Sequence, residues 1–194
     1  MRLFDPLYQR VLAWSAHRHA ERYLAALSFA ESSFFPIPPD VMLVPMCLAD
    51  RHKAWRFAAV TTLTSVLGGI AGYAIGYFFI DMIEPWLHSS GKHDTYLRVR
   101  EWFAVWGVWA VFVAGFSPIP YKIFTIAAGA TLLSLPGFVI ASAIGRGARF
   151  FLVAGLIVAG GERMADGLQR HVERLGWVVV AVAIAIGAYF MLRQ

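Results

Sequence analysis

The sequence predicts an all-α integral membrane protein, and its composition and the pattern of its apolar segments lead to that class. Hydrophobic residues make up 59% of the 194 residues and charged residues only 15%, whereas soluble domains usually carry about 25% charge. Several apolar segments approach the roughly 20 residues that a membrane-spanning helix needs. The net charge of +5 comes from basic stretches between these segments. That distribution favours an anionic membrane surface over nucleic acid as the partner.

Residues 1–27 predict an amphipathic helix. Apolar and basic residues alternate there at roughly helical spacing, as they do in helices that lie in the membrane interface. An ordinary packed helix would show the same pattern, so both interpretations stay open at this point.

The apolar segment 28–48 is broken by the stretch FPIPPD (35–40). Four prolines interrupt the segment: Pro36, Pro38 and Pro39 within this stretch, and Pro45 after it. Proline cannot continue a helix interior, and the halves on either side are too short to span a bilayer. The segment therefore predicts a re-entrant hairpin, with a kinked helix as the alternative. Two carboxylates, Glu31 and Asp40, flank the break.

Residues 57–80 predict a membrane span with a glycine face. The span follows the polar connector 50–56. Its glycines recur at a spacing of four residues: Gly68, Gly72 and Gly76. Such a face lets another helix approach closely. Packing within the chain and contact in a homo-oligomer fit this face equally well.

The second half of the chain shows the same order of elements. The apolar segment 103–133 is broken by SPIPYK (117–122), which contains Pro118 and Pro120. A second membrane span is predicted at 137–160. We therefore expect a second re-entrant hairpin followed by another span.

Two matched motifs indicate an internal duplication of repeats 28–80 and 103–160. Both hairpin breaks contain P-I-P, and SVLGGIAGY (65–73) resembles SAIGRGARF (142–150). Together the repeats form one predicted domain, residues 28–160. A polar linker and a last transmembrane helix make up the remaining part, 161–194.

The distribution of basic residues predicts the orientation. If both hairpins are re-entrant, segments 1–27, 50–56 and 162–174 share one side and hold most of the lysines and arginines. The positive-inside rule then places the N-terminus in the cytoplasm. The hairpins would enter from opposite faces as an inverted repeat, an architecture typical of transporters with a site near the membrane midplane.

The two halves carry opposite charges at membrane depth. The first half contributes Glu31 and Asp40, and the second contributes Lys122, Arg146 and Arg149. Isolated charges are expensive in a membrane, so such groups pair with one another or face water. We therefore expect the five side chains to converge, either as a site for an anion or as a structural ion-pair network.

These segments resemble the DedA family, also called the SNARE-associated or VTT-domain family, and in particular its YqaA-like branch. The resemblance covers roughly residues 25–160 and rests on ESSFFPIPPD, FSPIPYKIFTIAAG and GRGARF. It implies two facing re-entrant hairpins and lipid transport in the bacterial cytoplasmic (inner) membrane, chiefly of undecaprenyl phosphate. Glu31 and Asp40 match the acids of the family motif. Gly115 and Tyr121 stand where many members carry arginine.

The function predicted from these features is a flippase or scramblase for an anionic lipid, such as undecaprenyl phosphate or a phospholipid. Lys122, Arg146 and Arg149 would neutralise the phosphate, because an arginine fork binds phosphate oxygens well. Glu31 and Asp40 would pair with the empty basic site or take up protons, so proton coupling stays open. The alternative is a non-catalytic membrane-homeostasis or assembly factor with a structural charge cluster.

An intramembrane enzyme is the third class, and the motifs speak against it. The sequence has no G-x-S-x-G, no H-E-x-x-H and no acid-histidine phosphatase pattern. The six histidines show no metal-ligand spacing. We therefore expect no enzymatic activity, no metal and no cofactor.

Overall fold

The protein is helical throughout the part that the structure describes. The computed structural model describes residues 17–91, 93–117, 119–160, 178 and 181, and no strand occurs among them. The helices are α2 (Ala20–Ser33), α3 (Asp40–Ala49), the 3₁₀-helix η1 (Arg51–Lys53), α4 (Ala54–Ser89), α5 (His93–Phe116), α6 (Tyr121–Ala130) and α7 (Leu135–Gly160). Three stretches are long and apolar enough to cross a membrane: Arg51–Ile80, Tyr96–Phe116 and Leu135–Gly160. The predicted class of all-α integral membrane protein is confirmed.

Both ends of the chain fall largely outside this description. Most of the amphipathic helix predicted at 1–27 and nearly all of the linker and last transmembrane helix predicted at 161–194 lie outside the described residues. Within the described part, α2 begins at Ala20. The predicted boundary between residues 27 and 28 therefore falls inside one continuous helix.

The first break separates α2 from α3, as the prolines predicted. Pro36 and Pro38 lie between the helices, and Pro39 stands directly before the first residue of α3, Asp40. Proline lacks the N–H that a helix interior needs and disfavours helical backbone in the residue before it. The chain therefore leaves the helix after Ser33 and enters a new one only at Asp40.

The second break lies between α5 and α6. Pro120 precedes α6 with extended backbone at φ −60° and ψ 101°, while Pro118 lies outside the described residues. The first arm of this hairpin is longer than the apolar pattern indicated. Its stretch Tyr96–Phe116 could cross a membrane by itself, so a re-entrant second hairpin stays a prediction.

The polar region 81–102 is mostly helix rather than loop. α4 continues to Ser89 and α5 begins at His93. The chain reverses at Gly91, whose φ of +67° is a conformation that glycine adopts without strain. Polar side chains end a membrane span without ending its helix, so both helices extend beyond their apolar stretches.

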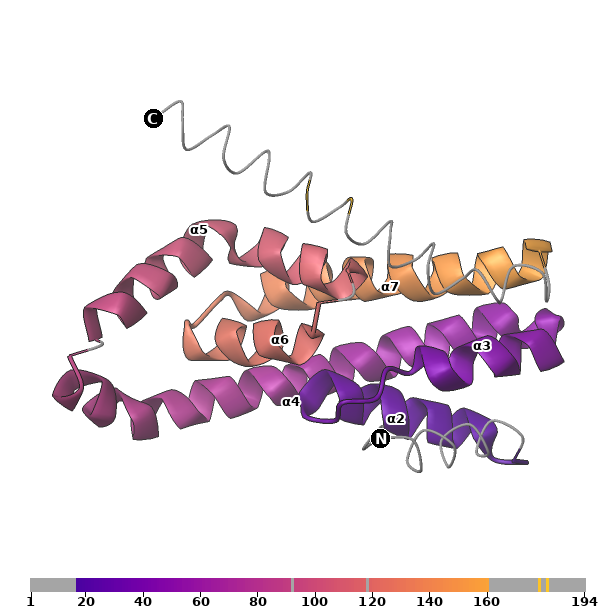
Figure 1. Ribbon diagram of the computed structural model, residues 1–194, viewed down its shortest axis with the longest axis horizontal. Coiled ribbons are helices and arrows are strands. Elements are labelled where there is room, and N and C mark those ends of the chain that lie inside the picture. The colour runs from indigo at the N-terminus through magenta and orange to yellow at the C-terminus, as the bar shows by residue number, and fades with distance from the viewer. Residues whose placement is uncertain (1–16, 92, 118, 161–177, 179–180, 182–194) are drawn as a thin grey trace, which may run out of the picture.

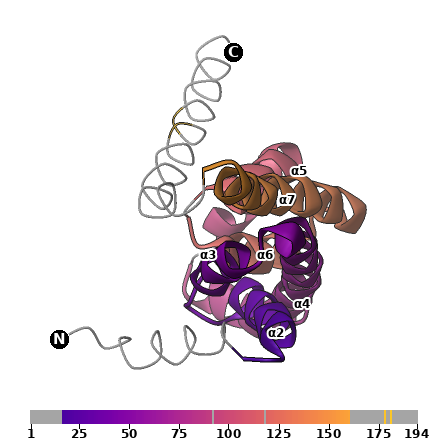
Figure 2. The same ribbon diagram turned by 90° about the vertical axis from the view of Figure 1, so that its right-hand side faces the viewer.

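The long helix α4 is the axis on which the molecule is built. Helices α2, α6 and α7 pack along it, and α5 packs mainly on α7. Figure 1 shows the hairpin α2–α3 lying along one half of α4, while α5 and α6 reach in from the other end, so that the two breaks face each other near the middle. Seen end on, α5 and α7 lie on one side and α2 on the other, and α4 reaches from α2 to α7 (Figure 2).

The glycine face of α4 is occupied within the chain. A Cβ atom at Gly68 would overlap the backbone carbonyl of Phe29 on α2, and one at Gly76 would overlap the carbonyl of Ile126 on α6. At Gly72 it would overlap the hydroxyl of Thr125. Glycine is needed here because two helices cross α4 at backbone contact. Packing within the chain therefore accounts for this face.

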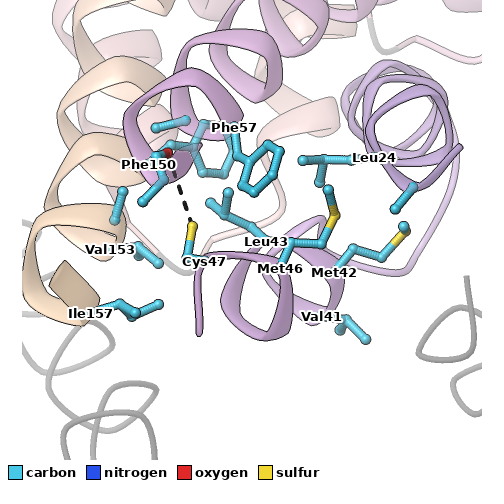
Figure 3. Packing of buried hydrophobic residues seen from close by; sticks show 14 of the residues in the cluster. Leu24, Val41, Met42, Leu43, Met46, Cys47, Phe57, Phe150, Val153 and Ile157 are labelled. Carbon is cyan, nitrogen blue, oxygen red and sulfur yellow. Dashed lines mark hydrogen bonds between the residues drawn. The ribbon is translucent and has the colours of Figure 1, made fainter. Parts of the chain in front are cut away.

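Two apolar clusters hold the halves together. The first joins α2, α3, the start of α4 and the end of α7, and Figure 3 shows part of it around Leu43, Cys47 and Phe150. Cys47 is fully buried there as a small apolar side chain. The second cluster joins α5, α6 and the start of α7 around Tyr121 and Phe138. The charged side chains lie between these two clusters.

Candidate functional site

Helix α7 carries both arginines of the predicted site on one face. Arg146 and Arg149 are three residues apart, a spacing that places side chains side by side on a helix. Arg146 reaches Glu31 of α2, and Arg149 reaches Asp40 of α3. The structure thus brings four of the five predicted charged residues together as two ion pairs, each joining the second half of the chain to the first.

The arginine of the first pair, Arg146, is enclosed by polar and aromatic groups, while 14% of its partner Glu31 is exposed. Nη2 of Arg146 lies 2.5 Å from Oε2 of Glu31, and Nε donates to Oγ of Ser65 at 2.6 Å. The guanidinium also lies over two aromatic rings, 4.9 Å from the centroid of Tyr121 and 4.7 Å from that of Phe150. Only 4% of the Arg146 side chain is exposed. Arginine stays charged in proteins, so these partners together replace the water that it has lost.

The second pair connects the two hairpin breaks. Nη2 of Arg149 lies 2.7 Å from Oδ2 of Asp40, the first residue after the first break. Nη1 donates to the backbone carbonyl of Ser117, the first residue after α5, at 2.9 Å. The other carboxylate oxygen of Asp40, Oδ1, is buried without a hydrogen-bond partner among the described residues. This pair therefore leaves one of its acceptor oxygens unused.

Lys122 lies apart from the carboxylates. Its Nζ lies 3.4 Å from the carbonyl oxygen of Phe34 and 3.3 Å from that of Phe35. Those carbonyls belong to the first break, where no following helical turn takes them up. Lys122 thus lies against the tip of the opposite hairpin, and the structure does not join it to Glu31 or Asp40.

Buried hydroxyl groups complete the site, and the sequence analysis did not identify them. Oγ of Ser32 and Oγ of Ser65 are 2.7 Å apart, and Oγ of Ser28 donates to the carbonyl of Thr61 at 2.8 Å. These pairs join α2 to α4 next to Glu31 and one helical turn before it. A signal existed, because Ser28 and Ser32 on one helix and Thr61 and Ser65 on the other share the spacing of four that marks one helix face.

The two positions at which this chain departs from the family motif both touch Arg146. A Cβ atom at Gly115 would lie 3.3 Å from the backbone nitrogen of Arg146, so a side chain there would require α5 and α7 to move slightly apart. Tyr121 is 1% exposed, donates its hydroxyl hydrogen to Ser142 and presents its ring to the guanidinium. An arginine carried by α7 therefore occupies the space that these two positions enclose.

The described residues contain no cluster of three or more side chains that could hold a metal ion. Binding of an anion here stays a prediction. The arrangement offers arginine N–H groups, a lysine ammonium and the backbone of two broken helices inside a largely apolar protein.

Comparison with known proteins places this arrangement in a family. The VTT domain matches residues 37–159. An uncharacterized protein of Haemophilus influenzae is 46% identical over the full length of both chains. The undecaprenyl phosphate transporter A of Staphylococcus aureus is 30% identical, with 81% of this chain and 82% of that protein covered. An alkaline phosphatase-like protein of Lactococcus lactis is 24% identical, with 87% and 82% covered.

No solved structure matches the chain significantly. The domain match covers more than half of the sequence and includes the second half of the first break, the whole second break and both arginines of α7, while Glu31 lies before it. The protein belongs to the VTT-domain family, the DedA family.

Proposed function

We propose that this protein moves an anionic lipid, such as undecaprenyl phosphate or a phospholipid, across the bacterial cytoplasmic membrane without chemically changing it. The observation that carries the proposal is the bridge made by Arg149 between the tips of two broken hairpins. The name of the Staphylococcus aureus relative supports the choice of substrate. The N-terminus is proposed to lie in the cytoplasm.

The proposed site is the meeting point of the breaks, with Arg149 and Lys122 as its cations. A lipid phosphate would compete with Asp40 for the guanidinium of Arg149, because the arginine fork binds phosphate and carboxylate oxygens with the same geometry. Lys122 lies against backbone carbonyls and would add a second positive charge. Transporters with broken helices use such free helix ends to bind ions near the midplane.

Proton coupling follows from the same exchange. When Arg149 turns to a phosphate, Asp40 loses its partner. A buried carboxylate without a partner is costly as an anion and neutral after taking up a proton. We propose that transport and proton uptake by the acids are linked in this way.

The alternative function is a non-catalytic membrane-homeostasis or assembly factor whose charge cluster is structural. The enclosure of Arg146 by Glu31, Ser65 and two rings favours a structural role for that pair. The pair between Arg149 and Asp40, with an unused oxygen, favours exchange. In our proposal, transport therefore depends on the pair between Arg149 and Asp40. The transporter and the assembly factor predict different effects when this pair is removed.

The test is lipid flipping in proteoliposomes. Wild type and Arg149→Gln would be reconstituted with a labelled phosphatidylglycerol and, separately, a labelled polyprenyl phosphate, with and without a pH gradient. Label accessible to a membrane-impermeant quencher would be followed over time. We expect Arg149→Gln to insert normally and to flip lipid at about a tenth of the wild-type rate or below it. A tenfold loss corresponds to about 1.4 kcal/mol less stabilisation of the transition state.

The matched control is Arg100→Gln, which removes an exposed arginine of α5 and should flip like wild type. If wild type moves neither lipid class, or if Arg149→Gln is as active as the control, transport at this site is wrong and the assembly factor becomes the better explanation.

A further inference from the structure

A second group of basic side chains lies away from the ion pairs, where α2 and α4 begin. Arg18 and Arg22, at the start of α2, and Arg56, at the start of α4, line a hollow of about 470 Å³. Its lining also includes the apolar side chains of Ala25 and Val60. Basic and apolar side chains in one hollow suit a ligand that is both anionic and hydrophobic.

The charge of this hollow is positive after its internal pairing is counted. Nε of Arg56 lies 2.9 Å from Oε1 of Glu21, which draws the arginine across the hollow from α4 to α2. Neither Arg18 nor Arg22 forms an ion pair with another described residue. Two arginines thus present their N–H groups to an incoming anion.

An exposed apolar strip leads away from the hollow. On α4 it continues from Val60 to Leu63 and Leu67, which are 66% and 56% exposed. On α2 it continues from Ala25 to Phe29, which is 40% exposed. Spacings of three and four keep these side chains on the hollow's face of each helix. The strip ends near the crossing of α2 and α4 at Gly68.

The hollow lies at the expected level of the lipid head groups. The stretch that can cross a membrane begins at Arg51, and Trp55, 48% exposed, neighbours Arg56. Tryptophan and arginine gather at the membrane–water interface. The strip below them then faces the acyl chains.

We infer that this hollow binds the phosphate of an anionic phospholipid, whose acyl chain lies along the strip formed by Phe29, Leu63 and Leu67. The ligand is a phospholipid rather than free phosphate, because only a lipid has an acyl chain that can contact the apolar strip. The site is separate from the one proposed for transport, and the inference does not depend on transport.

The test measures lipid binding to the full-length protein in detergent. Native mass spectrometry would compare phosphatidylglycerol with phosphatidylcholine of the same chains, for wild type and for Arg18→Gln/Arg22→Gln. Near a membrane surface each basic residue contributes about 1 kcal/mol to the binding of anionic lipid. We therefore expect wild type to prefer phosphatidylglycerol and the double variant to lose about tenfold or more of its affinity for that lipid.

Two comparisons make the result decisive. Arg98→Gln/Arg100→Gln removes two exposed arginines from α5 and should keep the preference for phosphatidylglycerol. Leu63→Ser/Leu67→Ser should weaken the binding of both phosphatidylglycerol and phosphatidylcholine. The inference is overturned if wild type binds the two lipids equally, if Arg18→Gln/Arg22→Gln keeps the preference, or if inorganic phosphate displaces the lipid as well as phosphatidylglycerol does.

Discussion

Two ion pairs join α7 to the first hairpin, and their surroundings differ. The pair between Glu31 and Arg146 joins the last turn of α2 to α7, with Ser65 and two aromatic rings completing the shell of Arg146. The pair between Asp40 and Arg149 lies at the two breaks, takes one partner from backbone and leaves Oδ1 of Asp40 without one among the described residues. Both pairs join an arginine to a carboxylate. They differ in how completely the surrounding groups provide partners for these charges.

The difference teaches which pair can open. Removing one partner from a buried ion pair leaves an uncompensated charge, and that loss is large where no water or polar group can replace the partner. For Arg146 the replacement would have to enter a shell that is already filled by side chains. For Arg149 an incoming anion meets a site at the ends of two helices. We expect the first pair to stabilise the fold and the second to exchange partners.

The largest effect should come from Glu31→Gln. It leaves the guanidinium of Arg146 charged and buried, so we expect the free energy of unfolding to fall by about 3–5 kcal/mol. Titration of the purified protein from mild detergent into a denaturing detergent, followed by circular dichroism, measures the loss.

The same substitution at Glu21 is the matched control. Its partner Arg56 is two-thirds exposed, and exposed pairs contribute about 0–1 kcal/mol. Equal losses for Glu31→Gln and Glu21→Gln would show that the pair between Glu31 and Arg146 does not stabilise the fold. The proposed difference between the two buried pairs would then be wrong.

A smaller effect is expected from Ser65→Ala. The variant removes the acceptor of the Arg146 Nε hydrogen bond and the partner of Ser32. A buried donor left without a partner costs about 1–3 kcal/mol. The same denaturation titration measures this loss, which should lie below that of Glu31→Gln.

Thr62→Val serves as the control for Ser65→Ala, since the hydroxyl of Thr62 bonds only to the Ala58 carbonyl of its own helix among the contacts described for it. Similar losses from both variants would mean that Ser65 acts as one more helix hydroxyl and takes no part in positioning Arg146.

Much of this arrangement was accessible from the sequence, for physical reasons that particular residues show. Proline disfavours helix interior, so Pro36 and Pro39 placed the first break and Pro120 the second. The prediction that Pro45 also breaks the helix was wrong, because this single proline lies inside α3. Charges in apolar segments need partners, so acids in one half and bases in the other implied that the halves meet. Glycine at spacing four implied close helix crossings, and α2 and α6 make them.

The individual partners were not accessible, because they depend on how far each helix is rotated and shifted. Nothing in the spacing of Arg146 and Arg149 decides which one meets Glu31. Lys122 was grouped with the arginines by its charge, yet it lies against carbonyls of the first break. A carbonyl left without a helical partner is a property of the folded backbone, and one-letter sequence does not contain it.

The smallest effect on stability should come from Asp40→Asn, and it should come with a loss of function. Arg149 is 13% exposed against 4% for Arg146, so its charge is less completely removed from water when its acid is neutralised. Asparagine also keeps an acceptor oxygen, and Arg149 keeps the Ser117 carbonyl, so we expect a loss of about 1 kcal/mol in the free energy of unfolding. Lipid flipping should nevertheless fall roughly tenfold, because the asparagine amide can neither hold the empty site by charge nor take up a proton. Denaturation and flipping would be measured on one preparation. A variant that unfolds as easily as Glu31→Gln would make the second pair structural too. One that flips lipid at the wild-type rate would remove exchange at Asp40 from the mechanism, even if transport itself stands.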